Sequence, residues 1–357
     1  MLVEARRARL LAALKRDGAI RISTIADELG VTPVTVRRDI DQLEREGLLR
    51  RVYGGAVAIA EEPSAAGMPD EHGSLGVVVP SLEYFWPGVV RGIEEEARLH
   101  GLRLVLRGSS YGPTDERPIL EHLARTPGVR GLIVAPNPAG PHRQELFQLL
   151  AESGLPHVLV EREGPPPPDG EALESVVSDY GQGTMAAVNH LVELGHRRVG
   201  LVCLRSPISP RIEVGWRAAC EQLGLASDNR FERVIPDRRS PDYQAAMSAL
   251  DEVLKEALAA GITALLVHAD PEAVAVVQHA QAMGILVPGD LSVVAYDDEI
   301  AGLFSPALTA VQPARADIGR AAVDLIVKRL ANPRRAVHRT VVSPRLVVRE
   351  STAPAES

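Results

Sequence analysis

A set of side chains able to read DNA bases lies between Thr32 and Arg45. Threonine followed by proline, as at Thr32 and Pro33, is typical of the cap and first turn of a helix. At about 100° per residue, the segment that follows places one apolar stripe on a single face, made by Val36, Ile40 and Leu43. The residues predicted to point outward near the helix start are Val34, Thr35, Arg37 and Arg38. Because arginine donates to guanine and apolar groups contact the thymine methyl, this helix is predicted to read the major groove.

Two further helices and a hairpin are predicted to hold this helix in place. Leucines at helical spacing indicate a helix over 1–16, and Ser23 or Thr24 can cap a second helix that ends at Gly30. A helix, a tight glycine turn and another helix make a helix-turn-helix. The segment 48–59 is predicted to form two strands joined at a Gly-Gly turn, which is a wing. The wing side chains expected along the phosphate backbone are Arg50, Arg51 and Tyr53.

Charge is distributed unevenly along the 357 residues. Residues 1–58 hold 11 lysines and arginines against 8 acids, whereas the remainder hold 28 against 39. A mildly basic head on an acidic body fits a protein in which only the head contacts phosphates. From the residues alone, the alternative is a protein–protein module whose basic face is merely solvated. The length indicates two or three folded units.

Short apolar runs alternate with helical segments after residue 73. These runs occupy 75–80, 102–108, 131–136, 157–161, 198–204, 264–269 and 292–298. Strands that alternate with helices predict an α/β fold in which parallel sheets are covered by helices on both faces. Ligands of such sheets bind beyond the carboxyl ends of the strands.

Aromatic and polar side chains follow some of these runs. Tyr84, Phe85 and Trp86 come after the first run, and three adjacent aromatic rings suit the apolar face of a sugar. A local hydrophobic cluster is the alternative for the same three residues. Asn137 directly follows the third run and is a candidate ligand contact for the same reason of position.

Two motifs invite an enzymatic interpretation. Ser110 lies in a Gly-Ser-Ser-Tyr-Gly segment after a strand, as a hydrolase nucleophile would, but Pro113 follows where a helix has to begin. The glycines at 181–186 fit a dinucleotide fingerprint, yet no ribose-binding acid follows about 20 residues later. No HExxH or paired CxxC indicates a metal site. We therefore expect neither an enzyme nor a bound cofactor or metal.

The chain is expected to act in the cytoplasm. It has no apolar run of about 18 residues, and its charged N-terminal segment lacks a small-residue cleavage site. Its two cysteines, Cys203 and Cys220, lie in apolar runs and are expected to be buried rather than disulfide-bonded. A transport solute-binding protein, the other alternative, is disfavoured because neither a signal peptide nor a lipid-anchor cysteine is seen.

The head resembles the DNA-binding domain of the DeoR family over residues 25–57. The resemblance is carried by IADELGVTPVTVRRDIDQLEREGLLRRVYGGAV, which includes Thr-Val-Arg-Arg-Asp at 35–39. Its second specific segment is the wing at 51–56, where the family usually has histidine in place of Tyr53. The resemblance implies a winged helix-turn-helix that binds operator DNA.

The body, over roughly 74–350, resembles the effector domain of the LacI/GalR repressors, which shares its fold with periplasmic sugar-binding proteins. Three segments carry this resemblance: VVSDYGQGTMAAVNHLVELGHRRVGLV at 176–202, GILVPGDLSVVAYDDEIAGLFSPALTAVQP at 284–313 and IGRAAVDLIVKRL at 318–330. It implies a two-lobed, type I periplasmic-binding-protein-like domain.

This resemblance also implies ligand contacts. Asp297, the first acid of the Asp-Asp pair, is expected to accept ligand hydroxyls. Arg211 is expected to clamp the ligand, although it stands four residues before Gly215 where many members have it three before. The usual Ala-Asn-Asp is replaced by His268-Ala269-Asp270, so His268 or Asp270 is a candidate for the missing asparagine contact; a plain strand-end histidine is the alternative for His268.

Head and body together indicate a hybrid regulator. The helix-turn-helix and hinge helix of LacI/GalR proteins are not recognised, nor is the sugar-phosphate domain usual behind a DeoR head. We expect a DNA-binding domain over 1–60, a flexible linker over 61–73 and a two-lobed ligand-binding and dimerisation domain over 74–357. The expected function is a homodimeric repressor released from double-stranded operator DNA by a small molecule, most plausibly a sugar; activation remains the alternative.

Overall fold

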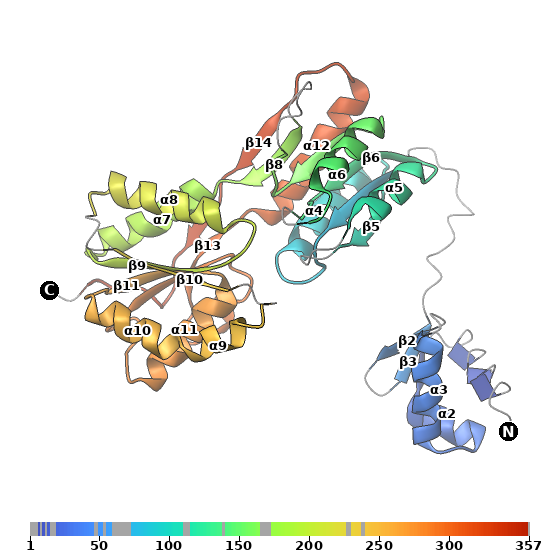
Figure 1. Ribbon diagram of the computed structural model, residues 1–357, viewed down its shortest axis with the longest axis horizontal. Helices are drawn as coiled ribbons and strands as arrows, with labels where there is room; N and C mark the ends of the chain where they lie inside the picture. The colour runs from blue at the N-terminus through green and yellow to red at the C-terminus, as the bar shows by residue number, and fades with distance from the viewer. Residues whose placement is uncertain are drawn as a thin grey trace. The chain divides into compact units, whose positions relative to one another are not determined.

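In the computed structural model the chain forms two compact units, 1–70 and 71–357. The structure describes residues 6, 7, 9, 10, 13, 14, 19–45, 49–52, 55–58, 73–109, 115–137, 140–164, 173–225, 230–236 and 240–355. The smaller unit is drawn in blue in Figure 1, and the larger unit contains two lobes. Within the described residues, no helix is both long and apolar enough to cross a membrane.

The smaller unit packs three helical segments against a small sheet. Described residues between Arg6 and Leu14 are helical, and they are followed by β1 (Ala19–Arg21), α2 (Ile22–Leu29), α3 (Pro33–Arg45), β2 (Leu49–Val52) and β3 (Gly55–Ala58). The strands are antiparallel in the order β1-β3-β2. The apolar stripe expected on the third helix is confirmed, because Val36, Ile40 and Leu43 are buried against the other helices.

Two details of this unit differ from the sequence prediction. The wing has a third strand, β1, and α2 begins at Ile22 rather than after Ser23 or Thr24. The three residues of β1 are too few to show an alternating pattern, and they become a strand by pairing with β3. Ile20 and Ile22 then both reach the core of this unit.

Lobe 1 of the larger unit is built on a six-stranded sheet in the order β14-β8-β7-β6-β4-β5, parallel at every pairing. Its strands are β4 (Ser74–Val79), β5 (Arg103–Gly108), β6 (Val129–Val134), β7 (His157–Val160), β8 (Glu174–Ser178) and β14 (Arg339–Val342). One face is covered by α4 (Trp86–Leu99) and α12 (Arg315–Ala331), and the other by α5 (Arg117–Arg125) and α6 (Arg143–Glu152).

Strand β4 shows why the apolar runs are continuous. Its side chains at Leu75, Val77 and Val79 join the core beneath α4 and α12, whereas Val78 joins the core beneath α5 and α6. A strand covered on both faces needs apolar side chains at every position.

Lobe 2 contains a second six-stranded sheet in the order β10-β9-β11-β12-β13-β15, parallel except where β15 pairs with β13. Its strands are β9 (Val199–Leu204), β10 (Arg230–Ile235), β11 (Ala264–His268), β12 (Ser292–Tyr296), β13 (Thr309–Gln312) and β15 (Arg345–Val347). Figure 1 shows α7 (Tyr180–Glu193) and α8 (Ser209–Gln222) on one face, and α9 (Tyr243–Ser248), α10 (Leu250–Ala259) and α11 (Asp270–Ala282) on the other. The helix-covered, predominantly parallel sheets confirm the expected α/β fold.

The chain passes between the lobes three times, at 178–180, 312–315 and 342–345. Each passage joins a strand of one lobe directly to a helix or strand of the other, so the cleft between the lobes is bounded by short segments. The Asp179 N–H donates to the Val342 carbonyl at 2.9 Å, which ties the first passage to the third.

A glycine contact fixes the helices beside the cleft in lobe 1. A Cβ added at Gly92 of α4 would lie 2.0 Å from the Ala316 carbonyl oxygen of α12, and one at Gly319 would lie 2.2 Å from that of Val89. The two helices therefore touch backbone to backbone, and only glycine permits this separation. Since α4 begins at Trp86 and α12 at Arg315, this packing sets where the adjoining cleft residues lie.

Candidate functional site

A cavity of about 240 Å³ lies between the two lobes of the larger unit. Lobe 1 lines it with the loop after β4 and the residues after β7, and lobe 2 with the ends of β9, β11 and β12. The lining residues are Ser81, Glu83, Tyr84, Phe85, Trp86, Glu161, Arg162, Tyr180, Leu204, Ser206, Pro207, Ile208, His268, Ala269 and Asp297. Five candidates proposed from the sequence are brought together here, namely Tyr84, Phe85, Trp86, His268 and Asp297.

The aromatic wall of the cavity comes from lobe 1. Trp86 is the first residue of α4, and its ring meets that of Phe85 edge to face at 5.6 Å. The guanidinium of Arg162 lies 5.8 Å from the Trp86 ring centroid, and that of Arg315 lies 5.8 Å from Phe85. Trp86 is only 2% exposed and also packs into the lobe 1 core. Trp86 is therefore a core residue that also lines the cavity.

Contacts that join the lobes across the cleft include those of Tyr84 and Arg211. Tyr84, at a left-handed φ of 57°, accepts a hydrogen bond on its hydroxyl from the backbone N–H of Asp270 at 3.3 Å. Arg211 on α8 pairs with Glu163 of lobe 1 at 2.8 Å. These contacts hold the lobes together on either side of the cavity.

Glu161 joins the cavity to the first passage between the lobes. Its buried carboxylate accepts hydrogen bonds from the Ser178 N–H at 3.1 Å, from the Ser178 hydroxyl at 2.6 Å and from the Tyr180 hydroxyl. Burial raises the pKa of Glu161. Because Ser178 ends β8 and Tyr180 begins α7, this one side chain contacts both sides of the passage.

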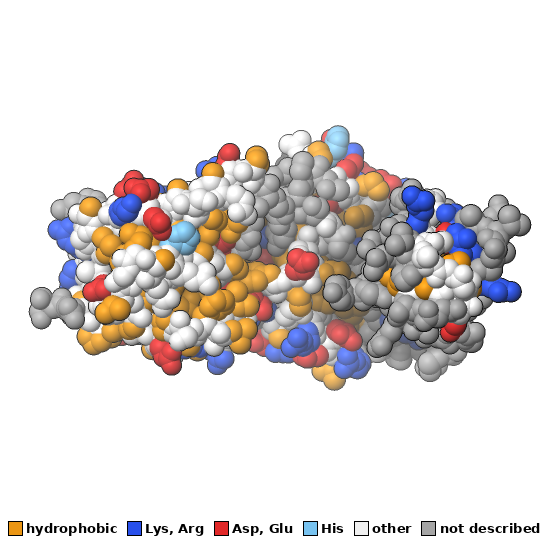
Figure 2. Space-filling model, turned by 90° about the horizontal axis from the view of Figure 1, so that it is seen from below, with side chains coloured by type: hydrophobic (Ala, Val, Ile, Leu, Met, Phe, Trp, Pro, Cys, Tyr) orange, Lys and Arg blue, Asp and Glu red, His pale blue; other side chains and the backbone are white. Residues whose placement is uncertain are grey.

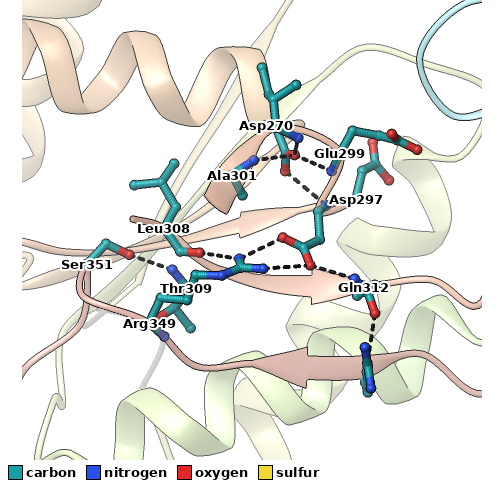
Figure 3. Close-up of polar contacts among 12 residues, drawn as sticks. Asp270, Asp297, Glu299, Ala301, Leu308, Thr309, Gln312, Arg349 and Ser351 are labelled. Carbon is teal, nitrogen blue, oxygen red and sulfur yellow. Dashed lines mark hydrogen bonds and ion pairs between the residues drawn. The ribbon is translucent and has the colours of Figure 1, made fainter. Parts of the chain in front are cut away.

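Asp297 lies directly after β12, and the loop it begins is held by Asp270 (Figure 3). The Asp270 carboxylate accepts backbone N–H groups from Asp298, Glu299, Ile300 and Ala301 at 3.1, 2.6, 2.9 and 3.1 Å. Asp270 is fully buried, and desolvation raises its pKa. Its oxygens thus accept four N–H groups of the loop, and Asp270 is not among the residues that line the cavity.

His268 lies at the end of β11 beneath the cavity. Its Nδ1 lies 3.8 Å from the Cys203 sulfur, and its ring meets Tyr296 edge to face at 5.9 Å. Burial raises the pKa of the Cys203 thiol to about 12, so the sulfur stays protonated. Both Cys203 and Cys220 are buried and free, as the sequence predicted.

In the smaller unit, α3 presents Arg38 to solvent and buries Asp39. The Thr35 N–H donates to the Thr32 hydroxyl at 3.3 Å, so Thr32 caps this helix as expected. The Asp39 carboxylate accepts hydrogen bonds from the side chains of Arg6 and Arg7, and the Arg7 Nε lies 3.3 Å from Oδ1. These contacts tie the N-terminal helical segment to α3.

Comparison with known proteins gives separate matches for the smaller and the larger unit. Residues 6–62 match the DeoR-like helix-turn-helix domain, and residues 188–352 match the periplasmic binding protein-like domain. A transcriptional regulator of HTH type from Streptomyces limosus is 30% identical over 360 residues, which cover 95% of this chain and 97% of the relative. A LacI transcriptional regulator from a Rhodococcus species is 25% identical with a TM-score of 0.66, over 79% of this chain and 98% of the other.

The chain belongs to the HTH-type transcriptional regulators, and its body is similar to that of a LacI regulator. Its head is of the DeoR-like type. The arabinose metabolism transcriptional repressor of Geobacillus stearothermophilus is another relative, 25% identical over 92% of this chain and 89% of its own. These relatives regulate transcription and are not enzymes, and Ser110 lies outside the described residues of the regulator.

The remaining candidates of the regulator lie apart from the cavity wall. Asn137 is buried after β6, where its backbone N–H donates to Glu116 at 2.9 Å. Arg211 forms the ion pair with Glu163 described above, and its guanidinium lies 6.0 Å from the centroid of the Tyr180 ring. In the head, Tyr53 lies outside the described residues, as do the side chains of Pro33, Val34, Arg37, Arg50 and Arg51.

Sequence reasoning missed Glu161, Arg162 and Tyr180. Arg162 donates to the Pro136 carbonyl at 3.1 Å and to the Glu161 carbonyl at 2.7 Å while its guanidinium faces Trp86. The signal that could have found the first two was a pair of charged residues immediately after the apolar run His157–Val160, at the carboxyl end of a parallel strand.

Proposed function

We propose that this regulator is a repressor whose affinity for its operator is controlled by an uncharged monosaccharide bound between the lobes. The observation that carries the proposal is a cavity with an aromatic wall on one lobe and the carboxylate of Asp297 on the other. The same proposal assigns DNA binding to 1–60, a linker to 61–73, and ligand binding and dimerisation to 74–357.

A small sugar suits both walls and the volume. The C–H face of a pyranose or furanose packs on aromatic rings, and its hydroxyls donate to a carboxylate. A volume of about 240 Å³ lies just below the roughly 300–1,000 Å³ typical of small-molecule sites, which favours a single ring. The relative that represses arabinose metabolism supports the same class of ligand.

The charges around the cavity favour a neutral ligand over a phosphorylated one. The lining has three carboxylates, from Glu83, Glu161 and Asp297, and one guanidinium, from Arg162. Arg162 already donates to two carbonyls. The start of α11, where a phosphate would find free N–H groups, donates instead to the Tyr84 hydroxyl and to Glu272. A phosphate would therefore meet more negative than positive charge.

Operator recognition is assigned to α3 and the wing. The base-contacting residues in this proposal are Thr32, Pro33, Val34, Thr35, Arg37 and Arg38, with Arg50, Arg51 and Tyr53 on the backbone. Two chains are proposed to associate through the larger units so that two heads meet the half-sites of a near-palindromic operator. Figure 2 shows hydrophobic side chains among charges of both signs on one face of the larger unit. Leu99 and Leu303 of this unit are 79% and 80% exposed.

The ligand acts by preferring one arrangement of the lobes. Contacts such as Tyr84–Asp270 and Arg211–Glu163 exist only when the lobes are together. A sugar that touches both walls stabilises that arrangement, and operator affinity falls by as much as the sugar prefers it.

The test is operator binding by fluorescence anisotropy with a panel of L-arabinose, D-ribose, D-xylose, D-glucose and D-galactose, each beside its phosphorylated form. Binding of each sugar is followed by the fluorescence of Trp86; the chain has only one other tryptophan, Trp216, which is buried in lobe 2. The proposal predicts that at least one neutral sugar binds and weakens operator binding and that its phosphate ester does not. A bound sugar that leaves operator affinity unchanged would contradict it. Sedimentation of the free protein tests the homodimer.

A further inference from the structure

The loop that carries Asp297 has an unusual backbone. Asp297 and Asp298 are consecutive and both have positive φ, 104° and 54°. Residues with a Cβ rarely adopt this region, and each such residue persists only where its surroundings hold it. Something must therefore hold this turn in the regulator.

The Asp298 side chain adds to the hold that the Asp270 carboxylate gives through the N–H groups of residues 298–301. The Asp298 carboxylate accepts hydrogen bonds from both terminal guanidinium nitrogens of Arg349, from Nη1 to Oδ1 at 2.6 Å and from Nη2 to Oδ2 at 3.0 Å. Gln312 donates to the same Oδ2 at 2.6 Å (Figure 3). Asp298 is 9% exposed, so this is a nearly buried carboxylate met by three donors.

These donors belong to segments that pass between the lobes or follow such a passage. Gln312 ends β13 at the second passage, and its side-chain oxygen accepts from Arg345 at the start of β15, after the third passage, at 2.7 Å. Arg349 follows β15 and also donates to the Leu308 carbonyl at 2.7 Å. At the second passage, Arg315 donates to the Asp297 carbonyl. The turn beside the cavity is thus anchored to two of the three passages.

We propose that Arg349 is a positioning residue for the effector: by holding the Asp298 carboxylate, it fixes the left-handed turn that presents Asp297 to the cavity. Arg349 is not among the lining residues and acts through Asp298. The proposal rests on the proposed function in one respect, the assignment of the ligand to Asp297. A bidentate pair fixes orientation as well as distance, so lysine is expected to replace Arg349 only in part.

A second pair in the same unit provides a matched control. The Arg329 guanidinium pairs with the buried carboxylate of Glu174 at 3.1 Å, and their side chains are 14% and 4% exposed. The side chains of Arg349 and Asp298 are exposed to a similar extent, 23% and 3%. Glu174 begins β8, whereas Ser178 at the other end of that strand contacts the cavity residue Glu161. Arg329→Gln therefore removes one of the two arginines that pair with Glu174, at the end of lobe 1 away from the cleft.

The experiment compares Arg349→Gln, Arg349→Lys and Arg329→Gln in the full chain with three readouts. Thermal unfolding measures the structural cost, Trp86 fluorescence measures the affinity for the panel sugar, and hydrogen exchange without ligand measures protection of the 298–301 amides. The proposal predicts that Arg349→Gln weakens sugar binding by about tenfold or more and speeds exchange at 298–301. Arg349→Lys recovers part of both, and Arg329→Gln changes neither while lowering the unfolding temperature similarly.

The proposal is overturned if Arg349→Gln and Arg329→Gln weaken sugar binding equally, or if exchange at 298–301 is the same in both. A wild-type protein that binds no panel sugar refutes the proposed effector class instead. In that case the exchange of the 298–301 amides still decides the role of Arg349, because it is measured without ligand.

Discussion

The hydroxyl of Tyr84 in lobe 1 accepts the backbone N–H of Asp270 in lobe 2 at 3.3 Å. Asp270 at the same time binds four N–H groups of the loop that begins at Asp297. Asp270, at the start of α11, therefore connects the loop that carries Tyr84 in lobe 1 to the loop that begins at Asp297 in lobe 2. Closure of the lobes and the shape of the cavity are linked through it.

Tyr84→Phe should release the sugar faster. The change removes one hydrogen bond across the cleft and keeps the ring, and such a bond contributes about 1 kcal/mol, or roughly fivefold in affinity. Stopped-flow fluorescence of Trp86 measures the dissociation rate. An unchanged rate would show that the Tyr84 hydroxyl does not hold the cleft closed.

Asp297→Asn should weaken sugar binding without altering operator binding in the absence of sugar. A hydrogen bond to a charged group contributes about 1.5–3 kcal/mol, so the expected loss is roughly ten- to a hundredfold. Fluorescence titration gives the affinity, and anisotropy with labelled operator gives the control. Equal sugar affinity in variant and wild type would remove Asp297 from the ligand site.

Arg38→Ala should abolish preference for the operator over other DNA. A bidentate contact to a base contributes about 1–3 kcal/mol of discrimination. Arg9→Ala is the matched control, because Arg9 is exposed on the same unit but lies on the N-terminal helical segment. Anisotropy with operator and scrambled DNA should show loss of discrimination for Arg38→Ala only; retained discrimination would mean that α3 does not read bases.

Stability should fall in mild acid because of His196. Its ring lies between the Thr263 hydroxyl at 2.8 Å, the Ser292 hydroxyl at 3.1 Å and the Ala353 carbonyl at 3.1 Å, and burial lowers its pKa. His196 therefore binds a proton more readily in the unfolded chain than in the folded one. The contribution of neutral His196 to folding stability is complete above the unfolded pKa of about 6.5 and is lost as the pH falls below it.

Urea unfolding of wild type and His196→Gln at about pH 7.5 and pH 5.5 isolates this effect. The raised pKa values of Glu161 and Asp270 act in the opposite direction, so the difference between the two proteins is the quantity to compare. Wild type should lose more stability than the variant on acidification. Equal losses would assign the pH dependence to other groups.

The sequence predicted seven body strands correctly because each contains a run of apolar residues, which is buried in all of them except the half-buried edge strand β5. It missed β8, β10, β13, β14 and β15. Strands β14 and β10 are at sheet edges, and β14 alternates between exposed and half-buried residues with arginine at its start. Such strands are recruited by their neighbours and carry too few apolar residues to be recognised alone.

The site was predictable only in part for a similar reason. Position after a strand identified Tyr84, Phe85 and Trp86, and resemblance added Asp297 and His268. Position could not decide what a side chain contacts: the Asp270 carboxylate binds a loop 28–31 residues further along the chain. Glu161 contacts Tyr180, which lies 19 residues further along the chain.

The most direct test of ligand control is reciprocity. If a sugar weakens operator binding by a given factor, operator DNA must weaken sugar binding by the same factor, because both report one coupling free energy. Titrating the sugar by Trp86 fluorescence with and without saturating operator measures that factor. Ligand control predicts a weaker sugar affinity on operator, equal in ratio to the loss of operator affinity; the same sugar affinity with and without operator would contradict it.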